Sequence, residues 1–215
     1  MVAQIDELDL PKGLPFDYQL AMDRLKGYAA PRNKLKQLCE SKQVVRLKQG
    51  LYVRSPGEEV NPLVLAGLIY GPSYVSLETA LVFYGLIPER TAEVTSVCLG
   101  KATRKVKRFQ TPLGRFSYRP VNERVFSVGF KLATEDGANY FLAEPEKALC
   151  DRIALVRGLS TMQEVRSLVF DDLRIDPEAL RSFRVPVVNE ISSRYQRRNV
   201  KAFALWLARG MEGGE

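Results

Sequence analysis

The sequence predicts an α+β protein in two parts. The first is a small N-terminal part with two helices and a strand hairpin. The second is a mixed α/β domain with a largely antiparallel sheet and C-terminal helices. Three observations lead to this: two short amphipathic helical patterns near the N-terminus, a central series of strand-like runs separated by turn residues, and a return of helical patterns after residue 144. The composition, 46% hydrophobic and 27% charged, is that of an ordinary globular protein.

The first predicted helix covers residues 17–26. Leu20, Met22 and Leu25 lie there among polar residues, which is the pattern of a short amphipathic helix. Gly27 follows and is expected to end it. A turn then leads into the next helix.

The second predicted helix begins at Pro31, a residue suited to the first helical position. Leu35, Leu38 and Cys39 recur at helical spacing and are expected to face inward. The opposite side then presents Asn33, Gln37 and Glu40, with Lys34 and Lys36 on its flanks. Of these residue types, asparagine, glutamine and lysine are well suited to read base edges and to hold phosphates.

Residues 44–54 contain two runs of strand-forming residues around a Lys-Gln-Gly turn, the pattern of a β-hairpin. Helix, turn, helix and basic hairpin together predict a winged helix-turn-helix over residues 1–56. The predicted DNA-binding residues are Arg32, Asn33, Lys34, Lys36, Gln37, Lys42, Arg46 and Lys48.

The net charge of +7 is unevenly distributed along the chain. Residues 24–54 carry nine basic residues against Glu40 alone, and residues 101–124 carry eight against Glu123. A third basic run, over residues 194–209, has no acid, and a solvated helix face explains it equally well. The second run predicts a secondary nucleic-acid contact through Lys101, Arg104, Lys105, Lys107 and Arg108.

A linker is expected around residues 55–62, because Ser-Pro-Gly-Glu-Glu and Asn-Pro are typical of turns and boundaries. The second domain is therefore predicted to cover residues 60–215. Its expected helices are 62–70, 76–84, 144–156, 162–170, 177–183 and 187–207, the last with a break near residue 199. Its expected strands are 93–99, 105–110, 115–121, 127–132 and 138–142.

Several classes of chemistry are disfavoured by what the sequence lacks. It has no histidine, which removes imidazole-based catalysis and metal binding. Cys39, Cys98 and Cys150 are too far apart for a metal knuckle and are expected to be small apolar core residues. We therefore expect a binding protein rather than an enzyme, with no catalytic residues, metal or cofactor. With neither a secretory pattern nor a membrane-length apolar run, the cytoplasm is the expected compartment.

One segment leaves an enzymatic alternative open. Glu144, Glu146, Lys147 and Asp151 resemble the carboxylate and lysine string of a metal-dependent nuclease. Alternatively, Pro145 begins a helix whose first-turn acids simply favour its N-terminal dipole. The residues thus leave two function hypotheses open: a DNA-binding protein without catalytic activity, and a metal-dependent DNA nuclease or defence protein with a winged-helix DNA-binding domain.

Several separated blocks resemble the AbiEi family of abortive-infection antitoxins. They are the helix from Pro31, the hairpin at 45–53, Tyr-Val-Ser-Leu-Glu-Thr-Ala-Leu at 74–81, Tyr-Gly-Leu-Ile-Pro-Glu at 84–89 and Ala-Glu-Pro-Glu-Lys-Ala-Leu-Cys-Asp at 143–151. The resemblance extends over about residues 16–156. Many relatives carry histidine where this chain has Tyr84, so no role is transferred to that position.

The resemblance implies a type IV toxin-antitoxin system with a role in phage defence. Such an antitoxin represses its own operon by binding inverted repeats in the operator DNA through the winged helix, which suggests a homodimer on DNA. Its partner would be a nucleotidyltransferase-like toxin, which it counteracts through the second domain without a stable complex. No membrane partner is implied.

Overall fold

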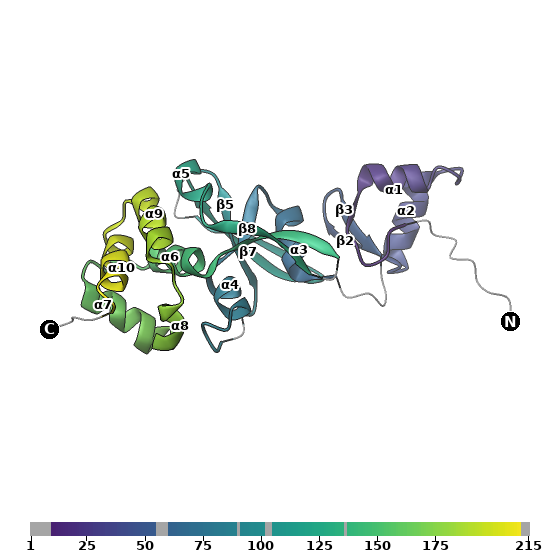
Figure 1. Cartoon of the computed structure of the whole chain (residues 1–215). Coiled ribbons are helices and arrows are strands. Elements are labelled where there is room, and N and C mark those ends of the chain that lie inside the picture. The colour runs from purple at the N-terminus through teal and green to yellow at the C-terminus, as the bar shows by residue number, and fades with distance from the viewer. Residues whose placement is uncertain (1–9, 55–59, 90, 102–104, 136, 212–215) are drawn as a thin grey trace.

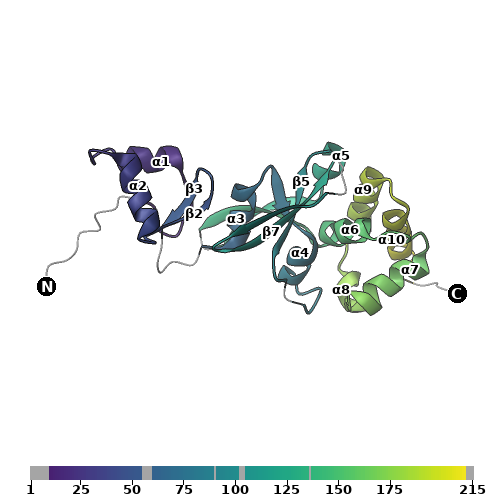
Figure 2. The same ribbon diagram turned by 180° about the vertical axis from the view of Figure 1, so that it is seen from behind.

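The computed structural model describes residues 10–54, 60–89, 91–101, 105–135 and 137–211. Its helices and strands form three groups in a row, with an N-terminal unit at one end, a mixed sheet in the middle and a group of helices at the other end (Figure 1). The view from behind shows the C-terminal helices α6 (Pro145–Leu155), α9 (Val185–Tyr195) and α10 (Arg198–Ala208) together at one end of the sheet (Figure 2). The N-terminal helices α1 (Tyr18–Arg24) and α2 (Pro31–Glu40) lie at the other end. The described chain is therefore α+β, as predicted.

The N-terminal unit contains the two predicted helices and the predicted hairpin, plus a short strand that the sequence did not reveal. The side chain of Asp17 accepts a hydrogen bond from the Leu20 N–H at 2.8 Å and so caps the first helix. The strands pair antiparallel in the order β1-β3-β2. The elements are β1 (Phe16–Asp17), α1 (Tyr18–Arg24), α2 (Pro31–Glu40), β2 (Val44–Lys48) and β3 (Leu51–Arg54).

The three-stranded sheet is buried on both faces. Val44 and Tyr52 pack toward α1 and α2, in a small core with Leu35 and Leu38 of α2. On the other face Leu47, Leu51 and Val53 belong to the large core of the rest of the chain. The apolar packing therefore continues across the predicted domain boundary.

The second sheet has six strands in the order β6-β7-β5-β4-β9-β8. Its pairs β5–β7 and β4–β9 are parallel and the other three are antiparallel, so the sheet is mixed rather than largely antiparallel as predicted. Two features cause the difference: the β6–β7 hairpin folds back so that β7 returns beside β5, and the unpredicted β4 lies between β5 and β9. The strands are β4 (Ser73–Val75), β5 (Val94–Leu99), β6 (Lys107–Thr111), β7 (Gly114–Val121), β8 (Phe130–Glu135) and β9 (Ala138–Ala143).

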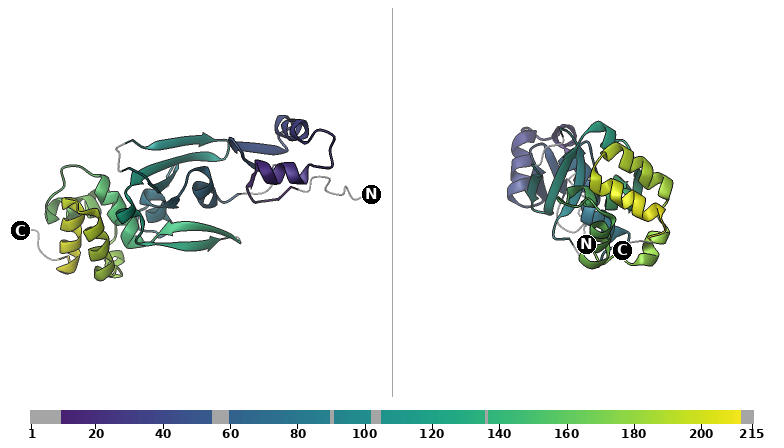
Figure 3. Two further views of the ribbon diagram at one scale, coloured as in Figure 1. Left: turned by 90° about the horizontal axis from the view of Figure 1, so that it is seen from above. Right: turned by 90° about the vertical axis from the view of Figure 1, so that its left-hand side faces the viewer.

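The view from above shows the strands of this sheet between the N-terminal unit and the C-terminal helices (Figure 3). Helices contact both faces of the sheet. The Tyr118 hydroxyl donates to the Ala66 carbonyl of α3 at 2.7 Å, whereas Thr95 hydrogen-bonds Thr79 of α4. Tyr118 pairs with Ser96, the neighbour of Thr95, so these two contacts lie on opposite faces. The first helices are α3 (Pro62–Ile69), α4 (Leu77–Phe83) and the unpredicted α5 (Glu123–Phe126).

The C-terminal helices follow the predicted order. The predicted helix at 187–207 is two helices, because Gln196 adopts a left-handed conformation (φ 54°) that ends α9. The predicted helix at 162–170 is α7 continued by a π-helical turn. The elements are α6 (Pro145–Leu155), α7 (Met162–Ser167), η1 (Leu168–Asp172), α8 (Pro177–Arg181), α9 (Val185–Tyr195) and α10 (Arg198–Ala208). Within the residues described, no helix is both long and apolar enough to cross a bilayer.

Candidate nucleic-acid interface

Helix α2 presents a polar face to solvent. Leu35 and Leu38 are buried, as predicted, while Cys39 is half-buried. The side opposite the core carries exposed Asn33 and Gln37, which lie one helical turn apart. Two side chains able to make bidentate hydrogen bonds to base edges thus share one exposed face.

The N-terminus of α2 is electrostatically favourable for phosphate. The helix begins at Pro31 after Ala30, without a side-chain cap and without an acid in its first turn. Its first-turn N–H groups and its dipole therefore attract an anion. Arg32 is exposed next to them.

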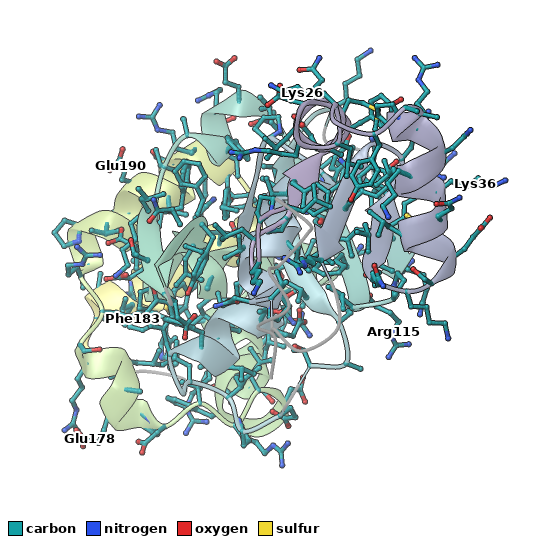
Figure 4. All side chains as sticks on the ribbon, turned by 90° about the vertical axis from the view of Figure 1, so that its right-hand side faces the viewer. Lys26, Lys36, Arg115, Glu178, Phe183 and Glu190 are labelled. Atoms are coloured by element: carbon teal, nitrogen blue, oxygen red, sulfur yellow. The ribbon has the colours of Figure 1, made fainter. Side chains whose placement is uncertain are left out.

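The two lysines of α2 differ in their surroundings. The ammonium of Lys34 lies 4.7 Å from the centre of the Tyr28 ring. Lys36 projects into solvent (Figure 4), and its ammonium is 3.7 Å from a Glu40 carboxylate oxygen. Both partners of this pair are well exposed, so the interaction is weak and a phosphate competes with it readily.

The residues predicted to bind DNA after α2 are divided by the structure. Lys42 and Arg46 are exposed. Lys48 is half-buried, and its ammonium donates to the carbonyl oxygen of Ile69 at 2.7 Å, at the C-terminal end of α3. The structure thus places the Lys48 ammonium against the C-terminal end of α3, while its contact with a DNA phosphate stays a prediction.

The basic run at 101–124 and the basic run at 24–54 both contact this C-terminal end of α3. The ammonium of Lys107 contacts the Tyr70 hydroxyl and lies 4.2 Å from the centre of its ring. Tyr70 directly follows Ile69, the partner of Lys48. Lys107 and Arg108 are exposed on the edge strand β6, preceded by exposed Lys101 and Lys105, whereas Arg104 lies outside the described residues.

The acids at 144–151 do not converge on a common point. The guanidinium of Arg184 donates to Glu146 at 2.8 Å and to Glu144 at 3.0 Å, whereas Asp151 pairs with Lys147. Over the described ranges, no three acidic, cysteine or histidine side chains form a group able to hold a metal ion. The carboxylates of the nuclease alternative are therefore engaged by protein donors at two separate places.

Glu146 makes the stability of the fold sensitive to acid. Burial raises its pKa, but hydrogen bonds from the side chain and backbone of Arg184 outweigh burial and leave the pKa below its usual value of 4.5. A carboxyl with a lowered folded-state pKa stabilises the protein above its unfolded pKa and loses this effect as the pH falls through the folded value. We expect urea midpoints to fall between about pH 5 and pH 3, less steeply for Glu146→Gln and Arg184→Ala. Parallel profiles for wild type and both variants would contradict this role.

A buried charge network joins α6 to the sheet and to α9. The ammonium of Lys147 is 2.8 Å from an Asp151 carboxylate oxygen, and both side chains are almost fully buried. Asp151 also accepts hydroxyl hydrogen bonds from Ser76 at 2.7 Å, Tyr195 at 2.6 Å and Tyr74 at 3.1 Å. Burial and then the charge of Asp151 raise the pKa of both tyrosines well above the usual value of a phenol.

The sequence contains part of the signal for this network. Lys147 and Asp151 are four residues apart on a predicted helix, a spacing that brings two side chains together. The contributions of Tyr74 and Tyr195 come from segments that are distant in sequence, and no local pattern reveals them. Lys147 also donates to the Val125 carbonyl at 3.0 Å, so its charge is well solvated by protein groups.

Gly129 is packed directly against this network. Its φ is +76°, and a Cβ placed there would lie 2.9 Å from the Cβ of Lys147. We expect Gly129→Ala to lower the free energy of unfolding by more than about 1 kcal/mol. Gly137→Ala is the matched control, because Gly137 has a similar φ of +74° but no described atom within 4 Å of its added Cβ. Equal losses in urea titrations would show that the contact with Lys147 is not tight.

Comparisons with known proteins show only distant structural similarity. No protein-family model matches the chain, and no curated protein matches it. Among solved structures, JHP933 from Helicobacter pylori is 12% identical with a TM-score of 0.32, covering 68% of this chain and 85% of its own. A candidate nucleotidyltransferase from H. pylori is 11% identical with a TM-score of 0.30, covering 71% of this chain and 94% of its own. At these values the similarity assigns no family and no function.

Proposed function

We propose that this protein is a DNA-binding antitoxin of a type IV toxin-antitoxin system that represses its own operon and counteracts a nucleotidyltransferase-like toxin. The observation that carries the proposal is the exposed face of α2. There Asn33 and Gln37 are free to meet base edges, and basic side chains flank them for phosphate contacts. The AbiEi-like sequence blocks supply the biological context.

The N-terminal unit has the element order of a winged helix, with α2 in the position of the recognition helix. In such domains the second helix of the helix-turn-helix enters the major groove and its N-terminal residues contact base edges. The hairpin that would form the wing is short, because β2 and β3 are joined directly at Gln49 and Gly50. Since Lys48 already binds the Ile69 carbonyl, Arg46 is the stronger candidate for a phosphate contact from this hairpin.

The second part of the chain is proposed to carry the antitoxin activity. Its AbiEi-like blocks form β4, α4 and the beginning of α6, which surround the Asp151 network. Its exposed basic residues on and before β6 are proposed as a secondary nucleic-acid contact. Two copies of the chain on an inverted repeat would place one α2 in each half-site.

The test uses full-length variants, because a truncation after residue 59 would expose Leu47, Leu51 and Val53. Arg32→Ala/Lys36→Ala/Gln37→Ala is expected to lose repression of a promoter reporter and to keep protection against the toxin encoded beside it. Arg181→Ala/Arg194→Ala is the control, because both side chains are exposed on α8 and α9 and pair with Glu178 and Glu190. Unchanged repression by the α2 variant would contradict the assignment of the recognition helix. Failure of the wild type to protect would contradict the antitoxin function.

A further inference from the structure

A pocket of about 480 Å³ lies where the mixed sheet meets the C-terminal helices. Its walls come from the end of β7, the C-terminal end of α6 and the segment that joins α9 to α10. These elements lie together at the end of the molecule away from α2 (Figure 2). The pocket is therefore separate from the proposed DNA-binding face.

The lining of this pocket is strongly basic. Four arginines contribute to it: Arg119, Arg157, Arg197 and Arg198. Across the described ranges, none of the four has a carboxylate oxygen within 4 Å. The one acid in the lining is Asp151, whose charge is compensated by the ammonium of Lys147 at 2.8 Å. The pocket thus presents uncompensated positive charge to a ligand.

Two of these arginines are held in place by the fold. The guanidinium of Arg197 donates to the Ala154 carbonyl at 2.6 Å, which fixes it at the C-terminal end of α6. Arg119 is half-buried, and burial followed by the nearby charge of Arg108 lowers the pKa of its guanidinium. A cation that is partly dehydrated and close to another cation gains most from an anionic partner.

Helix α10 adds a further favourable term. It is 11 residues long and begins at Arg198, without a side-chain cap and without an acid in its first turn. Arg197 and Arg198, at this helix start, both line the pocket. The positive end of the helix dipole therefore acts on the same space as the arginines.

A second hollow of about 480 Å³ adjoins the first and shares Leu77, Arg119 and Leu155 with it. It is lined by Arg115 and Ser117, which precede Arg119 on the same face of β7. Arg108 pairs with Ser117 across the β6–β7 hairpin and so points to this face as well. Glu78 and Glu93 also line this second hollow and balance its arginines, so the excess of positive charge lies in the first pocket.

We propose that this arginine-lined pocket binds the phosphate groups of a nucleotide-sized ligand. Arginine forms bidentate, charge-assisted hydrogen bonds with phosphate, and a volume near 480 Å³ is within the range of small-molecule sites. The Tyr195 side chain in the lining offers an aromatic surface beside the phosphates. The phosphates come either from a free nucleotide or from the end of a nucleic-acid strand. The proposal goes beyond repression and does not depend on DNA binding by α2.

The test is calorimetric titration of the full chain with three probes: inorganic pyrophosphate, ATP and a 5′-phosphorylated single-stranded RNA octamer. Arg157→Ala/Arg198→Ala removes two exposed pocket arginines that pack against little, so the fold is expected to persist, which circular dichroism checks. We expect wild type to bind at least one probe and this variant to bind it at least about 10-fold more weakly. The control Arg32→Ala/Lys36→Ala, in α2, should bind that probe like wild type.

The probes distinguish the two sources of phosphate. Binding of ATP with competition by pyrophosphate identifies a free nucleotide, whereas binding of the octamer alone identifies a strand, and both outcomes support the pocket. No binding of any probe at about 1 mM would overturn the proposal. It would also be overturned if the α2 control lost binding and the pocket variant kept it.

Discussion

Asp151→Ala is expected to lower the free energy of unfolding by about 3–5 kcal/mol, the usual cost of leaving a buried charge without its partner. The substitution leaves the Lys147 ammonium in a fully buried position with the Val125 carbonyl as its remaining acceptor at 3.0 Å. The hydroxyls of Ser76 and Tyr195 lose their acceptor as well. Trp206, the one tryptophan of the chain, is fully buried and reports unfolding in urea by its fluorescence.

The control for this prediction is Lys147→Met/Asp151→Asn, which removes both charges and keeps an oxygen acceptor for the hydroxyls. Because no uncompensated charge remains, the double variant should be less destabilised than Asp151→Ala alone. A loss below about 1 kcal/mol for Asp151→Ala, or a double variant that is less stable still, would show that the buried pair does not hold α6 against the sheet.

Removal of the basic residues of α2 should weaken DNA binding by orders of magnitude. Each phosphate contact contributes about 0.9 to the log-log slope of affinity against salt, so Arg32→Ala/Lys34→Ala/Lys36→Ala should flatten the slope by about 2.7. If the variant and the wild type bind DNA equally at 1 M salt, this difference in slope makes the variant bind about 500-fold more weakly than the wild type at 0.1 M salt. Fluorescence anisotropy with a labelled duplex, repeated over a salt series, measures both quantities.

The hairpin provides an internal comparison for the same measurement. Arg46→Ala should flatten the slope by about 0.9, whereas Lys48→Ala should leave it nearly unchanged, because the Lys48 ammonium is engaged by the Ile69 carbonyl. The exposed pair Arg181→Ala/Arg194→Ala, on α8 and α9, should have no effect. If the triple variant kept the wild-type slope, α2 would not lie against the DNA backbone.

Much of the N-terminal unit is predictable because its signals are local. Pro31 at the first position of α2 and the spacing of Leu35 and Leu38 identify the helix and its buried side. The Lys-Gln-Gly turn identifies the hairpin. The strand β1 was missed because two residues are too few for any alternation to appear.

Five of the six strands of the mixed sheet were predictable, but their pairing was not. A three-residue strand such as β4 carries no periodic signal, yet its position between β5 and β9 determines that the sheet is mixed. The break between α9 and α10 was expected near residue 199, and it falls earlier because the backbone at Gln196 turns left-handed. A single residue with positive φ leaves little trace in the sequence when it is not glycine.

The site residues show the same division between local and long-range information. The exposed face of α2 follows from helical periodicity alone. The binding of Lys48 to Ile69 and of Arg184 to Glu146 joins residues that are 21 and 38 positions apart, and only tertiary packing brings them together. The pocket arginines were visible as basic runs, except Arg157, but the cavity that they share was not.

The central claim is that α2 reads a specific DNA sequence, and the most direct test compares two duplexes. Anisotropy at about 0.15 M salt would measure the affinity of the full chain for DNA from upstream of its own gene and for a scrambled duplex of equal length. We expect the upstream DNA to bind at least about 10³-fold more tightly, as specific sites usually do, and Gln37→Ala to reduce this preference by roughly 1–3 kcal/mol. Equal affinity of the wild type for both duplexes would contradict the claim.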